Sequence, residues 1–380
     1  MDQIVSQMQR FMKRFNCGML FCAGADSVLY LSDMEFTPSS CNPVLYAVQP
    51  LSPTVIMVPA SGRRVIFTAS ALKQYIDDRR INADVYYYSS TLFIRYDPDI
   101  SRPEIYAPSL KDCIKRYLSD FSCTGADVYG DEPFRIFNEK NTILADNILE
   151  AEPLLTACRA IKVPEEIRRL RIASRVSYEA MEQIRITLEE GGPIRENDLF
   201  YIMRDVIYRQ RCQWNYTSLS AGPYSSDIYH RPCNYSLQDG DVVRMDVGAV
   251  WEGYGSDVAR CYFYGKPKEE EKRLYETLCE AQHRMVEAAG PGCDLGELFH
   301  IGDTYIKSHG YPEYRRSGLG HSVGVLTEEQ PFISPRNAGV IMEENMIFSI
   351  ETPYYIKDKA GFNVEDILLI TSNGHEILMN

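Results

Sequence analysis

Two aspartates stand inside a sequence pattern that is otherwise typical of a buried β-hairpin. Residues 241–250 form a predicted strand after a turn at Gly240, and residues 253–263 form its predicted partner. Asp246 and Asp257 fall within these strands, where aspartate is disfavoured. Two carboxylates that face one another across a hairpin repel unless a cation lies between them. A cation site is therefore one interpretation, and two solvated aspartates at strand ends are the other.

Two glutamates belong to apolar strand patterns further along the chain. Residues 346–353 form a predicted strand with Glu351 near its end, and residues 361–370 place Glu365 and Asp366 in a long apolar run. A charge within such a run is costly unless it is paired or bound to a metal. An edge strand with Glu365 in water is the alternative that stays open.

One histidine lies in a glycine-rich stretch, Gly318–Gly324, that lets the backbone pack closely around His321. A lone histidine can also be a structural residue held by hydrogen bonds. Taken together, the four carboxylates and the imidazole form an oxygen-rich set that suits Mn²⁺, Co²⁺ or Fe²⁺, and also Zn²⁺. The chain has no His-Glu-x-x-His and no Gly-x-Ser-x-Gly motif, so neither a zincin nor an α/β-hydrolase is indicated.

The chain is long enough for two domains, and Ala160–Pro164 is the predicted boundary. Before it, strand and helix patterns alternate as in an α/β layer. Pro164, followed by two glutamates, begins a predicted helix that Gly191 ends near residue 190. The strands expected in the first part are 18–31, 44–59, 84–88 and 127–130, and the helices are 71–80 and 110–121.

A weak internal repeat divides the second part. Residues 192–200 and 290–299 both begin a helix with Gly-Pro, both follow a long helical pattern, and both precede a β-rich stretch. Chance similarity of two helix stops is the alternative. Two related halves would place an active site between them.

The composition excludes some classes of partner. The net charge is −13 and the pI about 5.1, without the basic face that a nucleic-acid-binding protein needs. No stretch has the roughly 20 apolar residues of a membrane helix, and Met1–Phe15 lacks the apolar core of a secretory signal. The 11 cysteines are irregularly spaced, which favours reduced thiols and a cytoplasmic location.

The order Asp, Asp, His, Glu, Glu resembles the ligand order of the creatinase/aminopeptidase "pita-bread" family (peptidase family M24), which contains methionine aminopeptidases, Xaa-Pro aminopeptidases and prolidases. Its motifs are matched at Gly240–Gly248, Gly253–Asp257, Gly320–Gly324 and Glu365-Asp366. The resemblance implies an α+β protein. Residues 159–380 would form the pita-bread catalytic domain, a pseudo-twofold repeat of helices and a curved antiparallel sheet, after a creatinase/prolidase-like α/β domain in residues 1–158.

The resemblance also implies a hydrolase with two divalent metal ions, Mn²⁺ first among the candidates, that cleaves an amide C–N bond through a metal-bridged hydroxide. Glu351 would move the proton from water to the leaving amine. His230, about sixteen residues before the first aspartate, would contact the substrate; a surface histidine beside Arg231 is its alternative. The implied metal ligands are Asp246, Asp257, His321, Glu351 and Glu365, and the predicted substrate contacts are His230, Glu328, Asn363 and Tyr254.

Two positions depart from the family pattern. Glu328 stands where the peptidases carry a second histidine, and Asn363 replaces the prolidase arginine before the last glutamate. A carboxylate cannot donate a hydrogen bond unless protonated, and the lost arginine removes one partner for a substrate carboxylate.

Three hypotheses follow: an Xaa-Pro aminopeptidase or dipeptidase acting on small peptides, an amidohydrolase acting on a small non-peptide amide as in the ectoine-hydrolase and creatinase branches, and an inactive binding scaffold. The family's habit also predicts a homodimer.

Overall fold

The computed structural model describes residues 2–35, 52–90, 102, 105–119, 127–144, 147–357 and 359–379, without the side chains of 215–217. The chain divides into two compact units, Met1–Arg159 and Ala160–Asn380. Within the described ranges, no helix is both long enough and apolar enough to cross a membrane.

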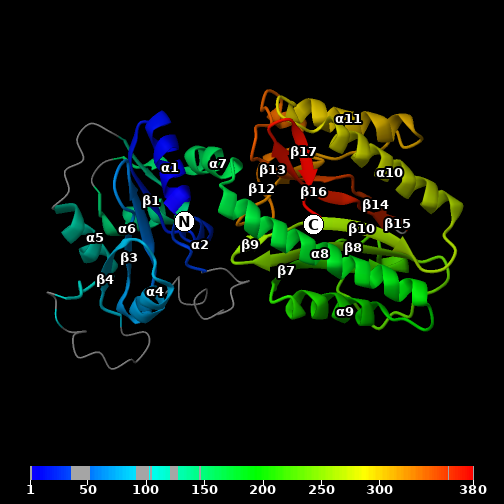
Figure 1. The fold of residues 1–380 in the computed structure, drawn as a ribbon, viewed down its shortest axis with the longest axis horizontal. Coiled ribbons are helices and arrows are strands. Elements are labelled where there is room, and N and C mark those ends of the chain that lie inside the picture. The colour runs from blue at the N-terminus through cyan, green and yellow to red at the C-terminus, as the bar shows by residue number, and fades with distance from the viewer. Residues whose placement is uncertain are drawn as a thin grey trace. The chain divides into compact units, whose positions relative to one another are not determined.

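The first unit is a layered α/β structure (Figure 1). Its helices are α1 (Asp2–Arg14), α2 (Ala25–Ser32), α4 (Lys73–Arg79), α5 (Leu110–Ser119), α6 (Glu132–Asn141) and α7 (Glu152–Ala160), with the short 3₁₀ turn η1 (Ser70–Leu72). Its strands are β1 (Cys17–Cys22), β2 (Val55–Pro59), β3 (Val65–Ala69), β4 (Asp84–Tyr88), β5 (Asp127–Gly130) and β6 (Leu149–Glu150).

The six strands form one mixed sheet in the order β4-β3-β2-β1-β5-β6. The pairs β1–β2 and β2–β3 are antiparallel, and the other three are parallel. The strands predicted at 84–88 and 127–130 are confirmed at those bounds. Residues 44–51 of the predicted strand 44–59 and residues 120–121 of the predicted helix 110–121 lie outside the described residues.

The predicted strand 18–31 is wrong in its second half, because β1 ends at Cys22 and α2 begins at Ala25. The Asp131 carboxylate accepts hydrogen bonds from the backbone N–H groups of Ala23 and Gly24, at distances of 2.8–3.0 Å. These bonds hold the turn between strand and helix. A short, wholly buried apolar run has no periodicity that separates a strand from a helix, so this break was not visible in the pattern.

The second unit contains two long helical pairs and an antiparallel sheet (Figure 1). Its helices are α8 (Pro164–Glu190), α9 (Glu196–Arg209), α10 (Glu269–Ala288) and α11 (Leu295–Ser308), with 3₁₀ turns η2 (Gly222–Tyr224) and η3 (Pro335–Asn337). Its strands are β7 (Gln213–Ala221), β8 (Val242–Trp251), β9 (Tyr254–Gly255), β10 (Val258–Phe263), β11 (Gly320–Ser322), β12 (Glu329–Phe332), β13 (Ile347–Glu351), β14 (Tyr354–Ile356), β15 (Ala360–Phe362), β16 (Glu365–Thr371) and β17 (Gly374–Ile377).

Seven of these strands follow one another in the order β12-β11-β13-β16-β10-β8-β7, with β17 added to β16 and β9 to β8. The helix predicted from Pro164 to about residue 190 is confirmed as α8, which packs on β8, β9 and β10. The two repeat segments begin α9 and α11, and α8–α9 and α10–α11 pack as pairs. Strands far apart in sequence therefore become neighbours at the centre of this sheet.

Candidate metal centre

Three of the predicted ligands lie in one row across the centre of the second unit's sheet. Glu351 on β13 pairs with Glu365 on β16, Glu365 pairs with Ala259 on β10, and Ala259 pairs with Asp246 on β8. Residues opposite one another in antiparallel strands point to the same face. We call Glu351, Glu365, Ala259 and Asp246 the ligand row; it brings carboxylates from strands about 120 residues apart onto one face.

Asp257 and His321 lie next to the ligand row. Asp257 lies between β9 and β10, and His321 pairs with Ser349, two residues before Glu351. His321 Nε2 lies 3.8 Å from Asp257 Oδ2 and 3.9 Å from Glu365 Oε1. Ligand atoms of Asp257, His321 and Glu365 all lie within 4.8 Å of one another, and all three residues are buried. This spacing is compatible with a cation shared by the three side chains.

The backbone at Gly320 allows this approach. Its φ is +144°, and a Cβ there would lie 2.3 Å from the carbonyl oxygen of Ser349. Only glycine therefore fits next to His321 at this point of β11. The Nδ1 of His321 lies 3.2 Å from the carbonyl oxygen of Ser322. If Nδ1 carries the proton and donates it there, Nε2 is left as the atom that faces the carboxylates.

Hydrogen bonds fix two of the carboxylates. Ser349 Oγ donates to Glu365 Oε1 at 2.6 Å and lies 3.1 Å from the Asp257 carbonyl oxygen. Asn363 Nδ2 donates to Glu351 Oε2 and to Glu365 Oε2, both at 3.3 Å. Glu365 is thus held by both Ser349 and Asn363, and Glu351 by Asn363.

The buried carboxylates are short of compensating positive charge. Burial raises the pKa of Asp246 to about 7, against the opposing effect of Arg244, and the charges of Glu351 and Glu328 add to the rise. Burial, then Glu365 and Asp246, raises the pKa of Asp257 well above its usual value. Burial, Glu351 and Asp246 do the same to the pKa of Glu365. Among the described residues, Asp246 Oδ1 and Asp257 Oδ1 are buried oxygens without a hydrogen-bond partner. Such oxygens, in a set of carboxylates with one imidazole, fit hard or borderline divalent cations.

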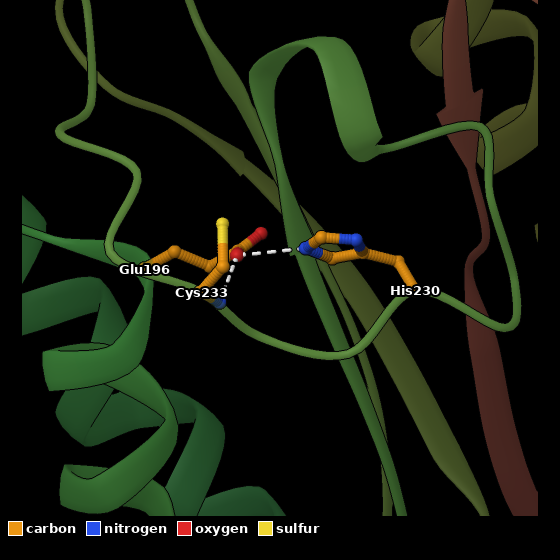
Figure 2. Close-up of side chains that lie close together, drawn as sticks. All are labelled: Glu196, His230 and Cys233. Carbon is orange, nitrogen blue, oxygen red and sulfur yellow. Dashed lines mark hydrogen bonds and ion pairs between the residues drawn. The ribbon is translucent and has the colours of Figure 1, made fainter.

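His230 belongs to a second cluster on the loop that follows η2. Figure 2 shows its ring pointing at Glu196, which begins α9, with Cys233 beside them. His230 Nε2 lies 2.8 Å from Glu196 Oε2, and the ring of Tyr224 stacks on the imidazole with 4.3 Å between centroids. A buried carboxylate therefore fixes the orientation of this histidine.

Glu196 also receives two backbone hydrogen bonds. The N–H of Ala221 donates to Oε1 at 2.8 Å, and the N–H of Cys233 donates to Oε2 at 2.7 Å. The Cys233 thiol lies close enough to complete a three-ligand group with Glu196 and His230. Because both Glu196 oxygens are already occupied, the arrangement favours a positioning role over a further metal site.

Comparison with known proteins identifies the family. The model of metallopeptidase family M24 matches residues 168–372. The chain belongs to this family. An Xaa-Pro dipeptidase from Pyrococcus furiosus is 32% identical over 240 residues, which are 63% of this chain and 68% of that protein. This M24 chain is accordingly Xaa-Pro dipeptidase-like.

Solved structures confirm the expected fold, an N-terminal mixed α/β sheet followed by a curled antiparallel sheet with helices. The prolidase from Pyrococcus furiosus superposes with a TM-score of 0.75 at 24% identity, over 98% of this chain and 99% of that one. The N-terminal domain of a FACT complex subunit from Cicer arietinum superposes equally well, with a TM-score of 0.75 at 14% identity over 100% and 96% of the two chains. At these identities the likeness concerns the fold alone.

The other predicted substrate contacts of the M24 chain lie in different settings. Glu328 is exposed, and its charge adds to the rise in the pKa of Asp246. Asn363 is fully buried and bonded to two carboxylates of the ligand row. Tyr254 is 1% exposed, its hydroxyl donates to Glu166 at 3.3 Å, and Arg169 lies over its ring. Tyr254 thus contacts α8, and these contacts give it a packing role.

Two residues of this M24 site carried weak sequence signals. Glu196 stands in the first turn of a helix, where acidic residues are common, so its bond to His230 was not foreseen. Arg244 stands inside the apolar strand that carries Asp246, and a charge at that position was the available signal.

Proposed function

We propose that this chain is a metal-dependent dipeptidase that hydrolyses the amide bond of small Xaa-Pro-type peptides. The observation that carries the proposal is the convergence of Asp257, His321 and Glu365 within 4.8 Å, beside two further carboxylates of the ligand row. In this assignment residues 159–380 are the catalytic domain, and residues 1–158 are the creatinase-like domain.

Five residues would hold the metal ions: Asp246, Asp257, His321, Glu351 and Glu365. Two divalent cations, with Mn²⁺ as the first candidate, would supply Lewis-acid activation of a water molecule and of the scissile carbonyl. Asp246, Asp257, His321 and Glu365 are buried, and this exclusion of bulk water strengthens every electrostatic interaction within the site.

Glu351 is the proposed proton carrier. It stands at the last position of β13 and is only partly buried, unlike Asp246 and Glu365. Asn363 Nδ2 fixes its Oε2, so Oε1 is the oxygen that would take a proton from the attacking water and deliver it to the leaving nitrogen.

His230 is proposed to contact the substrate carbonyl or the oxyanion that forms from it. Nε2 donates to the Glu196 carboxylate, so Nδ1 is the atom left for a ligand, and it donates to a substrate oxygen when the imidazole carries both protons. Stacking on Tyr224 limits rotation of the ring. His230 would act as an oriented hydrogen-bonding group whose position depends on Glu196.

A small non-peptide amide is the second candidate substrate. The exposed carboxylate of Glu328 and the amide of Asn363, whose Nδ2 is bonded to two carboxylates, replace two family groups, and both changes favour it. An inactive binding scaffold is the third candidate. It would require that the chain takes up no metal.

One experiment separates these candidates. The full chain is loaded with Mn²⁺ and assayed against Xaa-Pro dipeptides and against cyclic and N-substituted amides, with metal content measured in parallel. We expect metal uptake and dipeptide turnover. Turnover of non-peptide amides alone would replace the first candidate by the second, and absence of metal uptake would favour the scaffold.

We further propose a cytoplasmic homodimer. Described cysteines such as Cys22 and Cys261 form no disulfide within the part of the chain that the structure describes, which suits a reducing compartment. Sedimentation of the purified chain tests the dimer, and a monomer at all concentrations would contradict it.

A further inference from the structure

Arg244 brings a buried positive charge next to the ligand row. It lies on β8 two residues before Asp246, so both side chains point to the same face, about 7 Å apart along the strand. In the register it pairs with Ser220 on β7 and Cys261 on β10. His321 lies on the other side of the ligand row. Its partner on β13 is Ser349, and the pair Ser349–Ile367 is two residues along the strands from the pair Glu351–Glu365 of the row.

None of the hydrogen bonds of Arg244 goes to a carboxylate, although its charge acts on Asp246 from nearby. Nε donates to the carbonyl oxygen of Ser225 at 2.9 Å. Nη2 donates to Ser220 Oγ at 2.9 Å and, at 3.1 Å, to Ser218 Oγ and the carbonyl oxygen of Asp227. All four acceptors are neutral. Within the part of the chain that the structure describes, these four hydrogen bonds come from Nε and Nη2, and Nη1 makes none. Burial of a guanidinium whose hydrogen-bond acceptors are all neutral costs free energy unless an anion binds to it.

A second arginine lies across a shared aromatic ring. The Cζ of Arg244 is 5.2 Å from the centroid of the Tyr355 ring, and the Cζ of the exposed Arg316 is 6.0 Å from it. Burial raises the pKa of Tyr355, and this hydroxyl lies within the electrostatic reach of both arginines and of Asp246 and Glu351. The two arginines and two acids of the ligand row, Asp246 and Glu351, therefore all lie near the side chain of Tyr355.

We propose that Arg244, with Arg316 at the other side of Tyr355, forms an anion subsite that holds the C-terminal carboxylate of a dipeptide substrate. This inference rests on the proposed function and names its substrate class. The Nη1 edge of Arg244 is free to donate, and a guanidinium matches the geometry of a carboxylate.

The position of Arg244 relative to Asn363 supports the subsite. Cys261 pairs with Arg244 in the register, and its Sγ lies 3.4 Å from the backbone N of Asn363. Arg244 and Asn363 are therefore separated by a single strand. Asn363, which replaces the prolidase arginine, has its amide N–H groups engaged by Glu351 and Glu365. Arg244 supplies from β8 the guanidinium that position 363 lacks.

The subsite selects by the charge at the C-terminus of the peptide. A free carboxylate completes the buried guanidinium, whereas an amide or a further residue leaves it unpaired. Because a hydrogen bond to a charged group contributes about 1.5–3 kcal/mol, a free dipeptide should bind about 10- to 150-fold more tightly than its amide.

Equilibrium binding tests this preference. Alanyl-proline and alanyl-prolinamide are titrated into the Mn²⁺-loaded full chain carrying Glu351→Gln, which keeps both probes intact, with calorimetry as the readout. Arg244→Met, Arg244→Lys and Arg316→Gln are added to this background, and Arg336→Gln is the matched control because Arg336 is also an exposed arginine.

We expect the preference for the acid to disappear in Arg244→Met, to fall severalfold in Arg316→Gln, to be partly restored in Arg244→Lys and to be unchanged in Arg336→Gln. Equal loss of acid and amide binding in Arg244→Met would overturn the subsite, because it would show that Arg244 only ties the Ser225 loop to β8. If Arg244→Met does not fold, the test uses the chain that carries Glu351→Gln alone. Equal affinity of that chain for alanyl-proline and alanyl-prolinamide overturns the proposal.

The test separates the subsite from the proposed function. If the acid preference depends on Arg244 but the Mn²⁺-loaded wild-type chain hydrolyses no dipeptide, the subsite stands and the proposed function fails. If the wild-type chain hydrolyses the acid and the amide with equal kcat/KM, the function stands and the subsite fails.

Discussion

Asp246 of β8 and Glu365 of β16 both pair with Ala259 of β10, so a single small side chain separates two buried carboxylates on one face of the sheet. The Cα positions of the two acids are two strand spacings apart, about 10 Å. Both acidic side chains point to the face above Ala259, where cations would lie between them. The strand register therefore produces the ligand row, and bound cations would neutralise the negative charge of its carboxylates.

Removal of metal should destabilise the chain more at pH 8 than at pH 6. In the folded protein without cations the pKa of Asp246 is raised to about 7, above its unfolded value. The folded state then binds the proton more strongly, so its stability is greatest at low pH and is lost as pH rises through 7. Thermal unfolding with and without a chelator at the two pH values measures this. A larger loss at pH 6 would contradict it.

Asp257→Ala and Glu351→Ala should each reduce turnover at least about a thousandfold while the fold stays near native. Asp257 is a proposed ligand, and Glu351 is both a ligand and the proton carrier. Initial rates and circular dichroism are the measurements, and Glu344→Gln, which removes an exposed acid, is the control. Wild-type rates for either variant in metal-free buffer would disprove the mechanism.

Glu196→Ala should lower the free energy of unfolding by about 2–4 kcal/mol. The change leaves the buried N–H groups of Ala221 and Cys233 and one nitrogen of His230 without their partner. Cys233→Ala is the matched control, because Cys233 bonds to Glu196 through its backbone. Denaturant unfolding measures both. If Cys233→Ala were equally destabilising, or if it removed a bound metal, the three-residue cluster would be a metal site instead.

Glu166 should make stability depend on pH near neutrality. It is buried, and burial raises its pKa to about 7, against the charge of Lys162 and a backbone hydrogen bond. Its contribution is present below the unfolded pKa and is lost as pH rises through 7. The stability of the wild type relative to Glu166→Gln should thus fall between pH 5 and pH 8, by about 3 kcal/mol at most. A constant difference across this range would show that Glu166 does not titrate there.

Glu328→His should change substrate preference more than metal content. Glu328 is exposed and acts on Asp246 only through its charge. A histidine there could donate a hydrogen bond that a carboxylate cannot. Metal analysis and the kcat/KM ratio for two substrates measure the two effects, and a matching loss of metal would place Glu328 among the ligands.

Sequence alone predicted the elements that carry their own signals. The strand Asp84–Tyr88 alternates in exposure, and α8 has a proline start and a glycine stop, so local chemistry defines both. The candidate ligands stood out because charges are costly in apolar strands. Their convergence in one row depends on pairing between distant strands, which no local pattern encodes.

The missed features depend on tertiary context. The helix α2 is buried on all sides from Ser27 to Ser32, so its sequence lacks the apolar and polar faces of a helix on the surface. Glu196 and Arg244 acquire their roles only through contacts with the loop of residues 221–233, which the fold brings against α9 and β8. Such contacts connect side chains whose spacing in sequence carries no signal.

The most direct test is the metal stoichiometry of the purified chain after incubation with Mn²⁺ and removal of free ion. The account predicts two ions per wild-type chain and a loss of binding in Asp257→Ala, with unchanged secondary structure in both. A wild-type chain that stays folded and takes up no divalent ion would contradict it.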